Sequence, residues 1–579
     1  MFNKGANMKL FKRKNKDKLE NSWDKYYKKD QRNITIPDIS IYDYFESTTL
    51  NREYQTAINY FGVKTSFIEL IRKIDICAKA LVSSGVREDD VVTICLPNVP
   101  ESIIAFYAVN KIGAIASMLH PLSSEEEIKD SLIKTNSVFL FLHNQTLECV
   151  KNIIKKTKVY KTIVVSPKDS MPPLLSLGYY LTQDIKLPIE KNSEMFISWQ
   201  DFITKGEKYH NNVFIRRKKE SDAIILHSGG TTGTPKNIVL TNSNVNAIME
   251  QAKIDFDDLG VEDSFLSILP MFHCFGLIVN ILCPLMFGST VILIPRFDAK
   301  RFDKLIRRYN PTVLSGVPTL FEALIKNPYM KDIDMSNIKY IVSGGDTLTI
   351  EKNKLVNEFL KQHKSKARII QGYGMTETTG PATFGAKGSD KLGSVGIPLP
   401  GNKVKILNIE TKEEMNPNEI GEIFISGPTV MSRYLDNEKE TSSLIQVHED
   451  GLRWVSTGDL GYIDEDGVLF YVQRIKRMII SSGYNVYPSH IEEVLVKNKY
   501  IQEAGVIGVP HPYKVQVPVA YVVLKENIEK TPELVIEIQK YCEKNLSKYM
   551  IPKKIIFKDS LPKTLVGKIN YKELERERS

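Results

Sequence analysis

The chain has 579 residues, 42% of them apolar and 25% charged, which is ordinary for a globular protein and long for a single hydrophobic core. Its six cysteines stand singly, without a CxxC pair or metal-site spacing, which excludes a disulfide scaffold and favours a reduced, cytoplasmic protein that is not exported. No apolar run reaches the length of a membrane-spanning helix.

The formal net charge of +9 is concentrated at the start of the chain. Residues 1–32 hold eleven Lys and Arg against four Asp and Glu, a local charge of +7. The body of the protein is nearly neutral, so no nucleic-acid partner is expected. We predict that residues 1–34 form a flexible, solvated basic tail. The alternative is contact with an anionic membrane surface through apolar side chains such as Phe11 and Trp23.

From residue 62 onward, helical patterns alternate with short buried strands. We predict helices over 67–83 and 101–112, strands over 91–96 and 115–119, and another such unit over 137–165. The pattern resumes with strands over 223–226 and near 291–294, 313–316, 341–343 and 369–371. This alternation is typical of mostly parallel sheets covered by helices.

A proline-rich segment, 166–198, interrupts that pattern. Pro167, Pro172, Pro173 and Pro188 surround the apolar run over 174–181. We predict an excursion from the fold, which is either a surface flap packed on the body or a patch that faces lipid.

The last two parts of the chain differ in pattern from the first. Residues 393–472 hold short alternating strands, such as 404–407 and 422–426, between Gly and Pro turns, which favours a small distorted β-barrel. Residues 476–579 form a separate α+β module. The predicted fold class is therefore α/β: a large N-terminal domain over 35–475, built of βα subdomains plus the barrel, and a small C-terminal domain.

A loop of glycine and hydroxyl residues follows the strand over 223–226. It comprises Ser228, Gly229, Gly230, Thr231, Thr232 and Gly233 and is closed by Lys236. Glycines let backbone N–H groups approach a ligand and Lys236 adds a point charge, so the loop suits a polyphosphate. It is not a Walker P-loop, because neither Lys236 nor Lys568 lies in a Gly-Lys-Ser/Thr pattern. On this segment alone, a surface loop without a ligand stays open.

Seven further motifs follow in order, at 270–276, 343–346, 371–377, 456–459, 474–476, 482–488 and 561–569. With the loop, they resemble the signature of the adenylate-forming superfamily, which includes acyl-CoA synthetases, peptide-synthetase adenylation domains and luciferases. The Gly-Gly-Thr-Thr-Gly variant is similar to that of bacterial fatty acyl-CoA synthetases. The resemblance covers roughly residues 35–579. Asn237 departs from a usual Gly, and Arg477 stands where the family often has Asp.

The resemblance implies activation of a carboxylic acid by ATP to an acyl adenylate, followed by thioester formation with CoA. Lys568 would bridge the carboxylate and phosphate oxygens, Glu377 would hold Mg²⁺, and the Thr376 hydroxyl would face the α-phosphate. The alternative for Glu377 is an ordinary carboxylate at a helix N-terminus.

The resemblance also implies the nucleoside contacts. Asp459 would accept both ribose hydroxyls and Arg474 would add a second ribose contact. The predicted adenine set from the two glycine-rich motifs is Gly344, Gly345, Asp346, Tyr373 and Gly374, with the tyrosine ring stacked on the base.

Lys476 occupies the hinge position of the family, so the C-terminal domain is expected to be mobile and to rotate there between the two half-reactions. After rotation, Gly483 and Tyr484 would line the channel through which the pantetheine thiol arrives.

His273 resembles the gating residue at the mouth of the acyl pocket, although a lone His between Phe272 and Phe275 also suits a packed core. No acidic residue lies in 270–276 to hold an amino acid's ammonium group. We therefore predict a medium- or long-chain fatty acid. Open alternatives are an aryl or short-chain acid, transfer to an acyl carrier protein, and a non-enzymatic nucleotide-binding scaffold.

Overall fold

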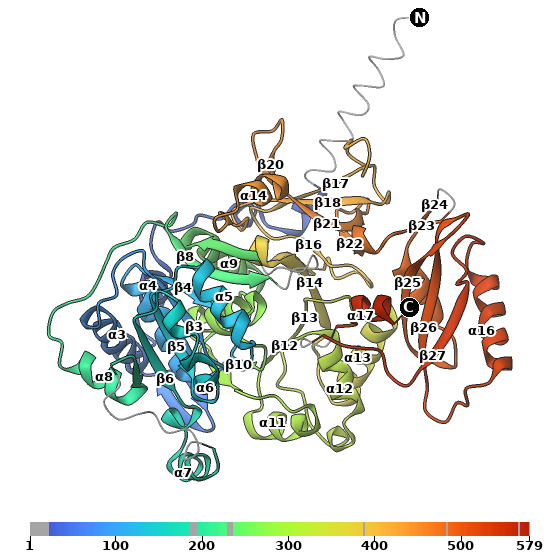
Figure 1. Ribbon diagram of the computed structural model, residues 1–579. Coiled ribbons are helices and arrows are strands. Elements are labelled where there is room, and N and C mark those ends of the chain that lie inside the picture. Colours follow the sequence, from blue (N-terminus) through green and yellow to red (C-terminus); the bar gives the residue numbers. More distant parts are fainter. Residues whose placement is uncertain are drawn as a thin grey trace, which may run out of the picture.

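Continuous apolar runs form the central strands of two large sheets (Figure 1). The computed structural model describes residues 22–183, 194–228, 236–385, 388–481, 484–564 and 568–577. Within these residues, each predicted strand of the βα region is present to within a few residues, and the helix predicted over 67–83 is α3 (Phe67–Ser83). The predicted α/β fold class is confirmed.

The first sheet has eight strands in the order β19-β9-β8-β4-β3-β5-β6-β7, and its six strands from β8 to β7 run parallel. Its strands are β3 (Val91–Cys95), β4 (Ile115–Met118), β5 (Phe139–His143), β6 (Lys161–Val165), β7 (Phe196–Ser198), β8 (Asp222–Ser228), β9 (Lys236–Thr241) and β19 (Arg433–Tyr434). Its helices are α3, α4 (Pro100–Lys111), α5 (Glu125–Lys134), α6 (Leu147–Lys151), α7 (Pro173–Thr182), α8 (Trp199–Glu207) and α9 (Asn242–Asp255). The β8–β9 hairpin is antiparallel and brackets the glycine-rich loop.

The second sheet has nine strands in the order β16-β15-β14-β13-β12-β10-β11-β1-β2. They are β1 (Thr56–Tyr60), β2 (Val63–Ser66), β10 (Ser264–Ser267), β11 (Thr290–Leu293), β12 (Val313–Gly316), β13 (Tyr340–Ser343), β14 (Ile369–Met375), β15 (Gly380–Phe384) and β16 (Ile397–Pro398). The helices of this half are α2 (Ile41–Thr48), the π-helix η7 (Phe275–Leu282), α10 (Cys283–Phe287), α11 (Phe302–Tyr309), α12 (Pro318–Lys326) and α13 (Ile350–Gln362).

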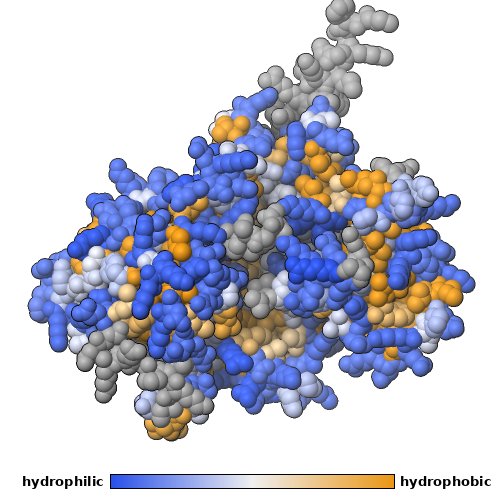
Figure 2. Space-filling view, viewed as in Figure 1, coloured by the Kyte–Doolittle hydropathy of each residue, from blue (hydrophilic) through white to orange (hydrophobic). Residues whose placement is uncertain are grey.

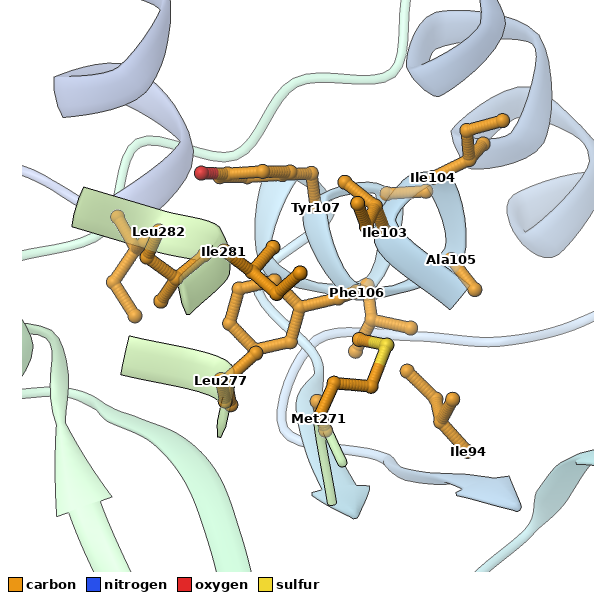
Figure 3. Close-up of a cluster of buried hydrophobic side chains, with 14 of the residues drawn as sticks. Ile94, Ile103, Ile104, Ala105, Phe106, Tyr107, Met271, Leu277, Ile281 and Leu282 are labelled. Carbon is orange, nitrogen blue, oxygen red and sulfur yellow. The ribbon is translucent and has the colours of Figure 1, made fainter. Parts of the chain in front are cut away.

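Helix α4 is the centre of the core that joins the two halves, and every one of its residues is buried. Phe106 lies against Leu277 and Ile281 of η7 (Figure 3). A helix that is apolar on all sides must be covered on all sides, so α4 packs on the first sheet and η7 at once. Leu277 and Ile278 of η7 are fully buried in this core.

The barrel consists of antiparallel strands: β17 (Lys403–Leu407), β18 (Gly421–Ser426), β20 (Ile445–Val447), β21 (Arg453–Ile463) and β22 (Leu469–Arg474), with α14 (Glu438–Leu444) before β20. Two short 3-10 helices, Ser22–Tyr26 and Lys29–Gln31, lie on it. Trp23 and Tyr27 are buried in the barrel cluster. The predicted flexible tail is therefore wrong for residues 22–32, because two large aromatic side chains find an apolar surface there; residues 1–21 lie outside the described residues.

The C-terminal domain follows the 3-10 helix η11 (Ile475–Arg477). It contains β23 (Ile479–Ser481), β24 (Tyr484–Val486), α15 (Pro488–Val496), β25 (Ile501–His511), β26 (Val515–Leu524), α16 (Pro532–Asn545), β27 (Lys554–Lys558) and α17 (Tyr571–Arg576). Helices α15 and α16 cover one face of its sheet, and Leu561 and Leu574 pack on the other. Among the helices described, none is long and apolar enough to cross a bilayer.

Glu101 is a buried carboxyl at the start of α4. Its Oε1 accepts a hydrogen bond from Ser170 Oγ (2.5 Å), while Oε2 is buried without a hydrogen-bond partner among the described residues. Burial raises the pKa of Glu101 to about 7, so the native state holds a proton that the unfolded chain releases near pH 4.5.

We expect the Glu101→Gln variant to be more stable than the parent above pH 7. A raised carboxyl pKa makes native stability fall as pH rises from about 4.5 to about 7, and the neutral amide removes about 2–3 kcal/mol of that loss. Urea unfolding at pH 5 and pH 8 measures this, and equal stability differences at both pH values contradict it.

Candidate active site

The candidate site lies where the second sheet, the barrel and the C-terminal domain meet (Figure 1). Strand β14 supplies Tyr373 and leads into the 3-10 turn η10 (Thr376–Thr378). Strands β21 and β22 supply Asp459 and Arg474 as a cross-strand pair. Lys568 comes from the C-terminal domain, which follows η11.

Asp459 is held as a buried acceptor. Tyr373 Oη donates to its Oδ2 at 2.8 Å, and Arg474 Nε lies 3.3 Å from Oδ1. Oδ1 is buried and receives no hydrogen bond from a described residue. Burial raises the pKa of Asp459, with Arg474 and Tyr373 acting in the opposite direction. A carboxylate oxygen with an unmet acceptor capacity suits the hydroxyl of a ligand such as ribose.

Tyr373 was predicted only as a stacking ring, and its hydroxyl contact with Asp459 was missed. The ring lies 5.8 Å from that of Tyr471, centroid to centroid. Gly374, predicted to contact nucleotide, has a packing reason: a Cβ there would lie 1.9 Å from the carbonyl oxygen of Gly380 on the paired strand. The stacking of the Tyr373 ring on the base and the nucleotide contact of Gly374 remain predictions.

Glu377 is a buried carboxylate with one oxygen committed. Tyr434 Oη donates to Oε1 at 2.7 Å, and no described residue donates a hydrogen bond to Oε2. The described residues contain no cluster of three or more His, Cys, Asp or Glu able to hold a metal. Mg²⁺ commonly binds through one or two carboxylates plus phosphate oxygens and water, so a single carboxylate in this position fits it. Tyr434, which the sequence analysis missed, orients that carboxylate.

Lys236 lies at the mouth of the glycine-rich loop, paired across the hairpin with Ser228. Its ammonium contacts Glu440 of α14 at 2.5 Å and lies over the ring of Tyr434 at 4.8 Å. The predicted phosphate contacts of Gly229, Gly230, Thr231, Thr232 and Gly233 lie outside the described residues. Thr376 lies directly before Glu377 in η10.

Asn237, the departure from the family's glycine, pairs with a buried histidine across the hairpin. His227 Nδ1 lies 2.9 Å from Asn237 Oδ1, and Nε2 lies 3.2 Å from Ser117 Oγ. Burial lowers the pKa of His227 to about 4, so the ring is neutral and its nitrogens are satisfied. The pair fixes the two strands that bracket the loop.

We therefore expect Asn237→Gly to lower the free energy of unfolding by about 1–3 kcal/mol, because it leaves Nδ1 of a buried imidazole unpaired. Urea denaturation measures the loss. Asn237→Asp, which keeps an acceptor oxygen, should instead raise the His227 pKa in an NMR titration. Unchanged stability of the glycine variant would show that the pair is dispensable.

Gly344, Gly345 and Asp346 follow β13 and begin the turn opposite β14. Gly345 has a φ of +76°, which side chains rarely adopt, and a Cβ on Gly344 would lie 3.2 Å from the ring of Phe275. Glycine is thus required for the turn itself. Asp346 also faces the C-terminal domain, where its carboxylate acts on Lys568.

Lys568 reaches the nucleotide set from the other domain. Its segment is anchored by the Thr564 N–H, which donates to the Lys568 carbonyl at 2.7 Å. Burial lowers the pKa of Lys568, with Asp346 and Asp459 opposing that effect and Arg474 adding to it. The ammonium therefore interacts electrostatically with three residues predicted to bind ATP, and the sequence position alone, 94 residues after Arg474, did not require this.

The loop that carries His273 is positioned by Asn98, which lies between β3 and α4. Asn98 Nδ2 donates to the carbonyl of Leu269 (2.9 Å), and Asn98 Oδ1 accepts from the Met271 N–H (2.9 Å). Burial, with His120 and Lys568 nearby, lowers the pKa of His273 to about 4. Phe272 lies between His273 and His120, at centroid distances of 4.6 and 4.2 Å. A neutral His273 thus faces Lys568; His120 was missed because no motif marks it.

Arg477, which stands where the family often has Asp, contacts residues of the C-terminal domain. Its guanidinium donates to Glu492 Oε1 (2.6 Å) and stacks 3.6 Å from the centre of the Tyr571 ring. Lys476 is exposed in η11. Gly483 lies outside the described residues and Tyr484 begins β24, so their predicted place in the thiol channel remains a prediction.

The two-domain architecture, with Lys568 supplied by the C-terminal domain, is the one that the sequence resemblance predicts for an AMP-forming acid–thiol ligase. The chain matches the family model of AMP-binding enzymes over residues 45–435 and that of the AMP-binding enzyme C-terminal domain over 490–568. It belongs to the AMP-binding enzyme family.

Named relatives agree with this class. The chain is 33% identical to a long-chain-fatty-acid–CoA ligase of Bacillus subtilis (strain 168), across 94% of this chain and 95% of that one. It is 29% identical to 4-coumarate–CoA ligase 3 of Arabidopsis thaliana, across 86% and 84%. The solved structure of an ATP-bound RpMatB-BxBclM chimera matches with a TM-score of 0.82 and 25% identity, across 93% and 99%.

Proposed function

We propose that this enzyme activates a medium- or long-chain fatty acid with ATP to an acyl adenylate and then transfers the acyl group to CoA. AMP and pyrophosphate are the other products. The observation that supports the proposal is that Lys568, from the C-terminal domain, interacts electrostatically with Asp346, Asp459 and Arg474. A cation from a second domain at this place matches the charge that builds up when two anions react.

In the first half-reaction, a carboxylate oxygen attacks the α-phosphorus and pyrophosphate leaves. Lys568 contacts the oxygens of both reacting groups, and its partly dry setting strengthens that attraction. Asp459 accepts the ribose hydroxyls through Oδ1, which orients the nucleotide. Glu377 would hold Mg²⁺ through its uncommitted oxygen, and the ion would screen the triphosphate charge. Thr376 places its hydroxyl beside the α-phosphate.

In the second half-reaction, the thiol of CoA attacks the acyl carbonyl, AMP leaves and a thioester forms. We propose that the C-terminal domain rotates at Lys476 between these steps, withdrawing Lys568 and bringing Gly483 and Tyr484 beside the pantetheine arm. Glycine suits a wall against which an extended arm must pass.

The acid class is proposed from the residues around His273. No acid stands in 270–276, and His273 is neutral, so nothing there binds an ammonium group. Met271, Phe272 and Phe275 make the surroundings apolar. The similarity to a long-chain-fatty-acid–CoA ligase across nearly the whole chain supports the same class.

The test is product analysis by mass spectrometry after incubation with ATP, Mg²⁺, CoA and single acids: acetate, saturated fatty acids of rising length, benzoate, cinnamate and several amino acids. We expect acyl-CoA, with the highest kcat/KM for medium or long fatty acids. A higher kcat/KM for benzoate or cinnamate would mean that the substrate is an aryl acid and not a fatty acid. If acyl adenylate forms without acyl-CoA, and the acyl group is transferred only to an acyl carrier protein, then the carrier protein and not CoA is the acceptor.

A further inference from the structure

Helix α7 is an apolar helix that the rest of the protein does not cover. Its sequence, residues 173–182, contains no Asp, Glu, Lys or Arg, and none of its residues is buried. Its large exposed side chains range from 42% exposed (Tyr180) to 82% (Leu174), and the others are Leu175, Leu177 and Leu181. Among the other described helices, none has more than one large apolar side chain so exposed. Figure 2 shows the resulting apolar patch at the lower tip of the molecule.

The base of α7 is fixed to the core, and within the helix Tyr179 Oη accepts a hydrogen bond from Gln145 Nε2 (3.3 Å). The carbonyl of Pro167 accepts a hydrogen bond from the buried Tyr60 Oη (3.1 Å), and Ser170 Oγ is bound to Glu101. Met171 packs on the main hydrophobic cluster. Beyond it, Pro172 and Pro173 start the helix, a common place for proline. The structure thus holds a rigid apolar helix away from the body.

The sequence before this helix carries an excess of positive charge, although Lys151 is paired with Glu148. Residues 151–183 contain six lysines and one acidic residue, Asp169. Lys168 Nζ lies 4.9 Å from the centre of the Tyr180 ring. Lys155 and Lys156, in the short helix η4 (Ile154–Lys156), form no ion pair with any described residue. Apolar side chains with an excess of lysines nearby in the sequence complement an anionic lipid surface, whereas a purely apolar protein groove would not require the lysines.

We propose that α7 is a membrane anchor that lies in the interface of an anionic bilayer, with its leucines among the acyl chains and the lysines at the phosphates. At about 15 Å the helix is too short to span the hydrocarbon core and suits an orientation along its surface. Tyr179 and Tyr180 carry the hydroxyl and ring that favour the boundary between lipid and water. If the proposed fatty acid substrate is correct, the anchor also brings the enzyme to the phase in which that acid dissolves.

The test is sedimentation of the full chain with vesicles of phosphatidylcholine alone or mixed with phosphatidylglycerol. We expect binding to the mixed vesicles that weakens as salt is added. The Leu174→Ser/Leu177→Ser/Leu181→Ser variant should bind at least about tenfold more weakly. The matched control, Leu355→Ser/Ile536→Ser, removes equally exposed apolar side chains from α13 and α16 and should bind as the parent does. Lys155→Gln/Lys156→Gln/Lys168→Gln should lose the preference for phosphatidylglycerol.

The proposal is overturned if the parent does not bind, or if the triple serine variant binds as well as the parent. Concentration-dependent self-association that the serine variant abolishes would make α7 a contact between copies instead, and would likewise overturn it. Because vesicle binding is measured without ATP, its outcome is separate from that of the proposed reaction. Activity on hexanoate without vesicles should be equal in the parent and the serine variant.

Discussion

Replacing Lys568 by alanine is expected to lower the rate of acyl-adenylate formation by about 10²–10³-fold while leaving the second half-reaction nearly unchanged. The reason is that Lys568, from the C-terminal domain, interacts electrostatically with Asp346, Asp459 and Arg474, where we propose that the two anions react. The proposed domain rotation removes it before the thiol arrives. Pyrophosphate release from acid and ATP measures the first step, and thioester formation from synthetic acyl adenylate and CoA measures the second.

The matched control for this variant is Lys572→Ala, an exposed lysine four residues further on, which should leave both steps intact. Equal losses in both half-reactions would mean that Lys568 stabilises the fold and does not act selectively in adenylation. Normal adenylation by the Lys568→Ala enzyme would remove the central support of the proposed function.

The pH dependence of adenylation gives a second readout of the same residue. Burial lowers the pKa of Lys568 and the Asp346 carboxylate opposes this, so the ammonium is lost, and the rate falls, as pH rises through that lowered pKa. Asp346→Asn should therefore move the alkaline limb of the rate profile to lower pH. A limb that moves to higher pH, or not at all, contradicts the assignment.

Replacing Arg477 by alanine is expected to destabilise the C-terminal domain by about 2–3 kcal/mol, less than for a fully buried ion pair because both partners are partly exposed. Arg477 spans Glu492 on α15 and Tyr571 at the start of α17, three residues after Lys568. Glu492 Oε1 also accepts from the Val506 N–H (2.8 Å). Without the guanidinium, a largely desolvated carboxylate loses its counter-charge and Tyr571 loses its stacking partner.

The Arg477→Met/Glu492→Gln double variant separates charge from packing. It keeps an acceptor for the Val506 N–H and a side chain of similar length over Tyr571, so it should recover much of the lost stability. Urea unfolding of the three proteins, followed by hydrogen exchange of residues in β25 and β26, measures this. If Arg477→Ala is as stable as the parent, the network does not secure the segment that carries Lys568.

Much of the fold was predictable, because patterning is local. The strand near 313–316 and the helix over 67–83 have the observed bounds, since buried strands are continuous apolar runs and an amphipathic helix has a 3.6-residue period. Within the predicted excursion over 166–198, α7 projects from the body, whereas β7 rejoins the sheet beside β6 (Figure 1). The tail prediction was wrong at Trp23, because composition around a residue does not reveal a distant apolar surface that can bury it.

The candidate site residues can likewise be divided into those that local motifs indicate and those that they do not. Asp459, Glu377 and Lys568 could be proposed from the sequence, because their motifs are short and contiguous and each needs only its own residue type. Tyr434, His120 and the His227–Asn237 pair were not, because each acts through a contact across strands or domains that no local spacing encodes.

By itself, the sequence determined the family, the order of the elements and the residue types of the chemistry, because motifs and hydrophobic periodicity are properties of neighbouring residues. Only the tertiary structure decided which oxygen of Asp459 receives no hydrogen bond from a described residue. It also decided that Arg477 contacts both Glu492 of α15 and Tyr571, close to Lys568, and that no residue of α7 is buried. These are matters of which distant surfaces meet, and packing in three dimensions settles them.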